Sequence, residues 1–83
     1  MHVAAPSFWK AYAALPPTVQ KKADAAFSVM RTDPQHPSLR FKQVGRYWSA
    51  RVDKSYRALA VKAPNTWVWF WIGEHSVYDR LIK

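Results

Sequence analysis

The residues best suited to chemistry lie near the end of the 83-residue chain, where His75, Tyr78 and Arg80 follow a run of large apolar side chains. An imidazole transfers protons near neutral pH, and a guanidinium fork suits phosphate oxygens. Arg57, on an earlier apolar segment, could supply a second fork. Metal-free RNA cleavage needs a base for the 2′-hydroxyl, cations for the charge on the phosphorane and an acid for the leaving 5′-oxygen. We therefore take His75, Arg57 and Tyr78 as candidate catalytic residues.

Each of these side chains also has a structural interpretation. His75 could be a strand-end histidine that bonds a backbone carbonyl, and Tyr78 could simply pack in the core or at its rim. Arg57 could pair with Asp53 or Asp79. Spacing alone does not choose between the two interpretations.

Charge indicates what such a site would act on. Thirteen Lys and Arg residues against five Asp and Glu give a net charge of +8. Most of the excess lies after residue 36, on segments predicted to be strands, which is typical of a folded cationic face for a polyanion. Nucleic acid is the first expected partner, an acidic protein segment the second and an anionic membrane the third. The candidate nucleic-acid-binding residues are Arg40, Lys42, Arg46, Arg51, Lys54 and Arg80.

Metal and cofactor sites are not predicted. The chain has no cysteine, three scattered histidines and five acidic residues that are not paired at short spacing, which disfavours a zinc site and a two-metal nuclease site. Two glycines in total provide no glycine-rich phosphate loop. No apolar stretch approaches the ~18 residues of a membrane span, and the N-terminus has no secretory signal pattern. We expect a cytoplasmic protein.

The elements that must position these residues follow from the patterning. Two helices that meet at Pro16-Pro17 predict an antiparallel αα-hairpin. Short turns after them allow only antiparallel neighbours, which predicts a four-stranded meander. The expected strands are 39–44, 47–52, 56–61 and 66–72, and residues 2–4 could add a fifth, edge strand. The prediction is thus one α+β domain over residues 1–83, with the hairpin packed on one face of an antiparallel sheet.

The last strand carries Trp67, Trp69 and Trp71 at alternate positions. Alternation places all three indoles on one face of a regular strand, where we expect them to fill the core rather than to form a platform for bases. Gly73 is expected to let the chain leave this strand.

The chain resembles the RelE/ParE toxin superfamily of bacterial type II toxin–antitoxin systems. The resemblance covers nearly the whole chain. Its most specific parts are the segment Tyr56-Arg57-Ala58-Leu59 and the ending Gly73-x-His75-x-x-Tyr78-Asp79-Arg80-Leu81. Some RelE-like nucleases have lysines in the preceding strand where this chain has Trp48 and Ala50, which leaves His75 as the better candidate for proton transfer.

The resemblance implies a toxin that cleaves mRNA, an mRNA interferase that acts on the ribosome and inhibits translation. Arg57 would stabilise the scissile phosphate, and His75 or Tyr78 would act in acid–base chemistry or orient the substrate. The implied partners are a cognate antitoxin, mRNA and the ribosome. Two alternatives stay open: a ParE-like inhibitor that binds DNA gyrase, and a relic that binds only its antitoxin.

Overall fold

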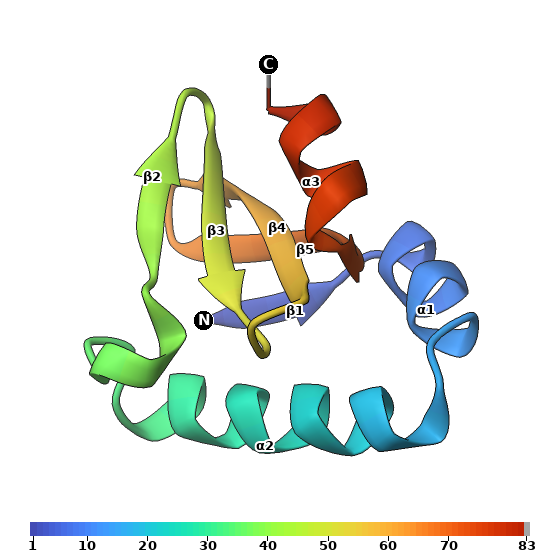
Figure 1. The fold of residues 1–83 in the computed structure, drawn as a ribbon. Helices are drawn as coiled ribbons and strands as arrows, with labels where there is room; N and C mark the ends of the chain where they lie inside the picture. Colours follow the sequence, from blue (N-terminus) through green and yellow to red (C-terminus); the bar gives the residue numbers. More distant parts are fainter. Residues whose placement is uncertain (83) are drawn as a thin grey trace.

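The computed structural model describes residues 1–82, which form an α+β fold with three α-helices and a five-stranded mixed sheet (Figure 1). The helices are α1 (Pro6–Ala13), α2 (Pro17–Thr32) and α3 (His75–Leu81), and a short 3₁₀ turn spans Pro37–Leu39. The strands are β1 (His2–Ala4), β2 (Lys42–Val44), β3 (Tyr47–Arg51), β4 (Tyr56–Ala63) and β5 (Thr66–Glu74). The first strand of the predicted meander is shorter than expected, because Pro37–Leu39 forms the 3₁₀ turn. No helix among residues 1–82 is long and apolar enough to cross a membrane.

The sheet has the strand order β1-β5-β4-β3-β2. Strands β2 to β5 form the predicted antiparallel meander, and each is joined to the next by a tight turn. The predicted edge strand is present as β1, but β1 runs parallel to β5, so the prediction of a purely antiparallel sheet is wrong. No tight turn links these two strands, which lie at opposite ends of the sequence. Their relative direction is therefore not dictated by a turn.

The two N-terminal helices do not form the predicted side-by-side hairpin. In Figure 1, α2 extends along one side of the sheet, whereas α1 stands at its edge beside β5. The extended backbone of Pro16 turns the chain between them. Contacts at the corner hold the helices together: Gln20 Nε2 donates to the carbonyl of Tyr12 at 3.0 Å, and the Tyr12 hydroxyl donates to Asp24 at 2.9 Å.

A β-bulge in β5 separates the three tryptophans that alternation had placed together. Trp69 pairs with Ala60, and Trp71 pairs with the next residue, Leu59, so Phe70 is the extra residue. A bulge shifts the alternation of side chains by one position. Trp69 therefore packs in the core on the helix face of the sheet, whereas Trp71 lies on the opposite face with Leu59. The prediction of one tryptophan stripe is wrong for Trp71.

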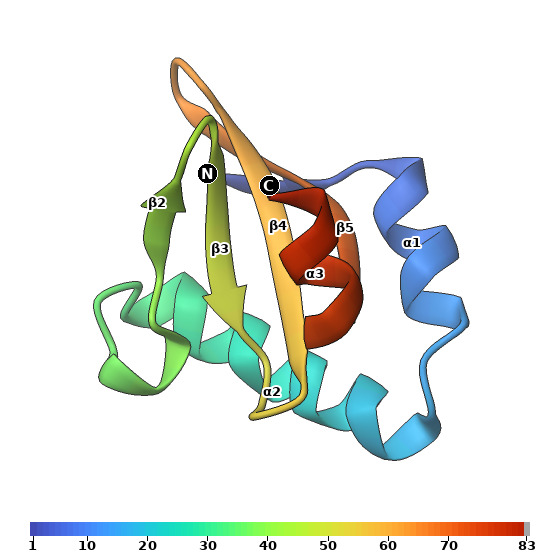
Figure 2. The same cartoon turned by 45° about the horizontal axis from the view of Figure 1, so that its top comes forward.

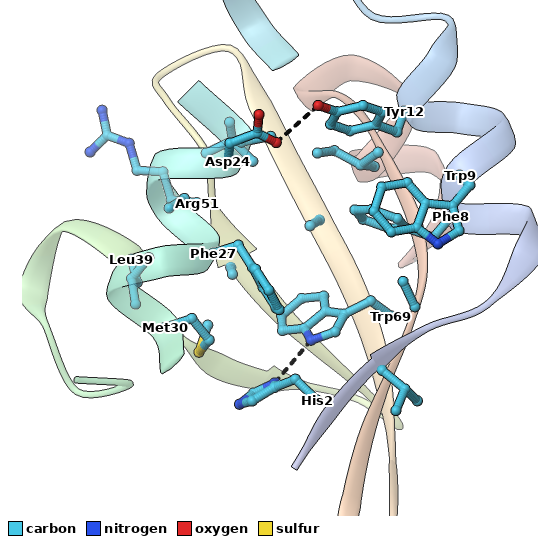
Figure 3. A pocket seen from close by; sticks show the side chains of 18 residues that line it. His2, Phe8, Trp9, Tyr12, Asp24, Phe27, Met30, Leu39, Arg51 and Trp69 are labelled. Atoms are coloured by element: carbon cyan, nitrogen blue, oxygen red, sulfur yellow. Dashed lines mark hydrogen bonds between the residues drawn. The ribbon is translucent and has the colours of Figure 1, made fainter. Parts of the chain in front are cut away.

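The core lies between the sheet and helices α1 and α2, and it is incompletely filled. A cavity of about 300 Å³ remains between them (Figure 3). Five alanines contribute to its walls: Ala4, Ala23, Ala26, Ala50 and Ala58. Two hydrogen bonds join polar groups at its wall, from the Tyr12 hydroxyl to Asp24 and from Trp69 Nε1 to His2 Nδ1 at 3.0 Å (Figure 3). This cavity is apolar and contains none of the three candidate catalytic residues.

Helix α3 covers part of the other face, in front of β4 and β5 in Figure 2. It was not predicted, and it begins directly where β5 ends, at Glu74. Gly73 is still inside β5, so it does not release the chain as expected. A Cβ at Gly73 would lie 2.5 Å from the Trp71 ring. Glycine is needed there because the indole packs over its backbone.

Candidate functional site

The β3–β4 hairpin places two arginines opposite each other. Arg51, the last residue of β3, pairs with Arg57 near the start of β4, and Arg57 pairs with Gly73 on β5. Paired residues of neighbouring strands project from the same face. Like charges directly opposite each other destabilise a sheet, so this pair is not explained by folding.

Asp53 fixes the turn that joins the two strands. Its Oδ1 accepts hydrogen bonds from the backbone N–H groups of Ser55 and Tyr56 at 2.8 and 2.9 Å, and its Oδ2 pairs with Lys22 at 3.2 Å. Burial alone would raise the pKa of Asp53, but the Ser55 N–H, Lys22 and the Tyr56 N–H together lower it. The carboxylate is thus used by the hairpin backbone and by Lys22 of α2, and it does not pair with Arg57.

Arg57 is half-buried and is held by backbone oxygens. Its Nη1 donates to the carbonyls of Asp53 and Tyr56. Burial lowers the pKa of Arg57, and the charges of Arg51 and Arg40 lower it further, whereas Tyr78 and Asp53 oppose the shift. The guanidinium nevertheless stays charged in a protein. The predicted salt bridges of Arg57 with Asp53 or Asp79 do not form among residues 1–82.

Arg40 is a third arginine near this pair, since its charge acts on Arg57, and its own backbone is left-handed. Its φ is 45°, directly after the 3₁₀ turn. Two contacts fix that turn: His36 Nδ1 accepts from the Ser38 N–H at 3.2 Å, and Leu39 is buried in the core. Left-handed backbone is uncommon for a residue with a side chain. We call Arg40, Arg51 and Arg57 the arginine cluster.

His75 is the first residue of α3 and lies beside the same hairpin. Its backbone N–H donates to the carbonyl of Ser55 at 2.7 Å. Its imidazole Nε2 lies 3.2 Å from Asp79 Oδ1, one helical turn along, and 47% of the side chain is exposed. The alternative interpretation of a carbonyl-bound strand-end histidine is therefore wrong. Sequence analysis missed this role of Asp79, although the i,i+4 spacing would have indicated it had the helix been predicted.

Tyr78 is buried, with 6% of its surface exposed. Its ring centroid lies 5.6 Å from that of His75, and the residue is close enough to Arg57 to influence its pKa. Tyr78 thus anchors α3 on the sheet between the imidazole and the arginine cluster. Its packing interpretation is confirmed, and a direct part in the reaction stays a prediction.

The other predicted cations are spread over this side of the sheet and its ends. Lys54 shares an open hollow of about 480 Å³ with His75, where the chain enters β4 and leaves β5. Lys42 pairs with Ser49, which is on the same face as Arg51. Arg80 is exposed on α3, and Arg46 is at the tip of the β2–β3 hairpin, at the other end of β3.

Two groups of polar side chains therefore lie next to each other, at the end of the sheet where a turn joins β3 to β4. One is the arginine cluster, and the other is His75 with Asp79 and Lys54. No group of three or more His, Cys, Asp or Glu side chains within residues 1–82 could hold a metal ion.

Comparison of the sequence with models of known protein families identifies its family. A model of the ParE-like toxin domain matches residues 17–80. The chain belongs to the ParE-like toxin domain family. This confirms the resemblance to the RelE/ParE toxin superfamily. A search of curated proteins finds no match.

Solved structures share the fold at low sequence identity. The RelE toxin in the RelB–RelE antitoxin–toxin complex of Methanococcus jannaschii superposes with a TM-score of 0.73 and 17% identity, covering 94% of this chain and 96% of that one. YafQ from Escherichia coli gives a TM-score of 0.68 and 13% identity with the same coverage. A copper-bound mutant toxin from Helicobacter pylori gives 0.63 and 10%, covering 92% and 94%. At such identities the superpositions show the fold of this ParE-like toxin domain and no more.

Proposed function

We propose that this ParE-like protein is the toxin of a bacterial toxin–antitoxin system and that it cleaves RNA at the β3–β4 end of its sheet. The observation that carries the proposal is the arginine cluster. Arg57 lies opposite Arg51 in the sheet and the charges of Arg51 and Arg40 both act on it, and a fold gains nothing from that arrangement. A phosphate would relieve the repulsion by accepting hydrogen bonds from the Arg57 donors that the backbone does not use.

The reaction uses groups on both sides of that phosphate. The substrate 2′-oxygen attacks phosphorus as His75 takes up its proton, the bond to the 5′-oxygen breaks, and His75 returns the proton to that oxygen, which leaves a 2′,3′-cyclic phosphate and a 5′-hydroxyl. His75 is the acid–base residue, and Asp79 orients its imidazole from 3.2 Å. The arginine cluster stabilises the charge that develops on the phosphorane. Tyr78 acts as a positioning residue, because its buried ring fixes α3, and with it His75, against Arg57.

The partners follow from the same proposal. The mRNA or ribosomal RNA backbone is held by Arg40, Lys42, Arg51, Lys54 and Arg80, and the cytoplasmic ribosome presents the mRNA. A cognate antitoxin neutralises the toxin. The Methanococcus neighbour supports this last partner, because that RelE toxin is in complex with its RelB antitoxin.

The test compares four proteins in a translating bacterial extract, with mRNA 5′ ends mapped by primer extension. Wild type is expected to cut mRNA. His75→Ala should slow cleavage by about 10²–10⁴-fold, and Arg57→Ala by about 10²–10³-fold. Arg31→Ala, which removes an exposed arginine from α2 on the other side of the sheet, is the matched control and should cleave at the wild-type rate.

The ParE-like description of the family model favours one alternative, inhibition of DNA gyrase by binding. Supercoiling of plasmid DNA by purified gyrase is therefore measured with the same proteins. Intact transcripts together with loss of supercoiling would overturn the ribonuclease proposal. Equal cleavage by wild type and His75→Ala would remove only the role of that histidine.

A further inference from the structure

We propose that Arg46 and Tyr47 form a second RNA subsite, which stacks a base of a single-stranded substrate at the far end of β3 from the arginine cluster. This inference rests on the proposed function, because it extends the path of the same RNA strand.

The pair is organised before any ligand binds. The Arg46 guanidinium carbon lies 5.2 Å from the centre of the Tyr47 ring, and Arg46 Nη2 donates to the Tyr47 hydroxyl at 3.1 Å. Both residues belong to a tight two-residue hairpin, in which Gly45 has a φ of +61° and Val44 pairs with Tyr47. A glycine with positive φ at the first central position is typical of a type II′ turn. The flat guanidinium and the ring are therefore held on rigid backbone.

An aromatic ring lies beside this pair, and no acidic side chain among residues 1–82 forms an ion pair with its positive charge. Phe70, the residue displaced by the bulge, lies 5.3 Å from Tyr47 between ring centroids. Val61 on the strand between them is exposed. Among residues 1–82 no carboxylate forms an ion pair with Arg46. Bases of single-stranded RNA are recognised by stacking on aromatic rings and on guanidinium planes, and this surface offers both.

The pair and the arginine cluster are linked by one cation, Lys42, on the same face of the sheet. Tyr47 and Arg51 are four residues apart on a regular strand, so they share a face and are separated by about 13 Å. Lys42 projects from the same face between them, because it pairs with Ser49. One strand of a few nucleotides can therefore place a phosphate on Arg51 and Arg57, a second phosphate near Lys42 and a base on Arg46 and Tyr47.

The experiment measures binding of fluorescently labelled single-stranded RNA by the His75→Ala protein, which binds without cutting. Oligonucleotides from two to eight nucleotides are compared, one series with 2-aminopurine at each position in turn. Tyr47→Leu is the main variant, because it keeps apolar bulk beside Phe70 but removes the π-face. Phe27→Leu is the matched control, since Phe27 is an aromatic residue, 45% exposed, on α2 across the sheet.

Loss of one stacked base should weaken binding of the longer oligonucleotides by about 5- to 100-fold. Binding of the dinucleotide should not change, and quenching of 2-aminopurine at one position should disappear. Tyr47→Phe should retain both the affinity and the quenching, and Phe27→Leu should match the parent protein. A thermal unfolding scan of each variant confirms that it is folded under the binding conditions.

The outcomes separate the two proposals. If Tyr47→Leu binds every oligonucleotide as tightly as its parent, while Arg57→Ala loses binding, the stacking subsite is wrong and the proposed function stands. If the parent binds no RNA and wild type cleaves none, both proposals are wrong.

Discussion

At the scale of single residues, Arg51 and Arg57 show a conflict between folding and the proposed function. They face each other across β3 and β4, and Arg40 adds a third positive charge. Asp53, a nearby carboxylate, is already engaged by two backbone N–H groups and Lys22. Such repulsion is tolerated where an anion must bind.

Replacing Arg51 by Gln should therefore stabilise the folded protein while weakening RNA cleavage. Removal of one like charge from a directly opposed pair should raise the free energy of unfolding by about 0.2–1 kcal/mol. The gain should shrink as salt rises, because salt screens exposed charges. Urea unfolding at low and high salt measures it. An Arg51→Gln protein that is less stable at low salt would contradict the argument.

Candidate site residues could be named from the sequence, and their catalytic roles stay predictions, but the contacts between them could not be foreseen. His75 and Tyr78 stand out by residue type and by their spacing after a buried strand, and Arg57 stands out as a charge within an apolar segment. The Asp79 contact requires α3, whose seven residues follow β5 without a loop or a capping hydrogen bond. The role of Gly73 requires the position of the Trp71 ring. Both depend on tertiary packing rather than on local pattern.

At the scale of elements, strand β5 shows why the sheet was only partly predictable. Its six apolar residues from Trp67 to Ile72 carry no alternation of polar and apolar types that would reveal a bulge. The direction of β1 could not be predicted either, because no turn joins β1 to β5, with which it pairs in parallel. The tight turns that join β2 to β3, β3 to β4 and β4 to β5 left one arrangement for these four strands, which is why the meander was predicted correctly.

Deletion of Phe70 should remove the bulge and leave the fold intact. Trp69–Ala60 and Trp71–Leu59 would then be consecutive pairs of a regular ladder. The variant loses the Phe70 contacts with Tyr47 and Ser7, which should cost about 1–3 kcal/mol. Circular dichroism and urea unfolding should show a cooperative fold. Deletion of Val68 is the control, since it shifts Trp67 off its face and should abolish cooperative unfolding.

The docking of β1 should depend on pH through His2. Burial lowers the pKa of His2 from 6.5, and the positive N-terminus lowers it further. The unfolded chain therefore binds more protons, so this part of the stability is present above about pH 6.5 and is lost as pH falls through the folded pKa. Protonation would also remove the acceptor that Nδ1 offers to Trp69 Nε1.

His2→Gln keeps a hydrogen-bond acceptor but does not titrate. The difference in free energy of unfolding between wild type and this variant should decrease from about pH 7.5 to about pH 5. Tryptophan fluorescence during urea unfolding measures it at each pH. A difference that is constant over this range would show that His2 does not couple to folding.

At the scale of the whole molecule, the net charge of +8 is divided between two faces with different roles. The face with α2 carries the apolar cavity, and Asp24, whose carboxylate accepts from the Tyr12 hydroxyl, lines it. The opposite face carries Arg57 and Lys42, whereas Arg51, which pairs with Arg57, also lines the edge of the cavity. Total charge draws any polyanion to the protein, whereas its placement decides where the polyanion binds.

RNA affinity should therefore depend on salt through the residues of one face only. Each phosphate contact on a single strand contributes about −0.7 to the slope of log K against log salt concentration. Arg51→Gln should make this slope less negative by about 0.7. Arg31→Gln, which removes the same charge from α2 on the other face, should leave the slope unchanged. Binding of single-stranded RNA by the His75→Ala protein, titrated from about 50 to 300 mM salt, measures both. Equal changes in the two variants would mean that overall charge, and not the arginine cluster, holds the RNA.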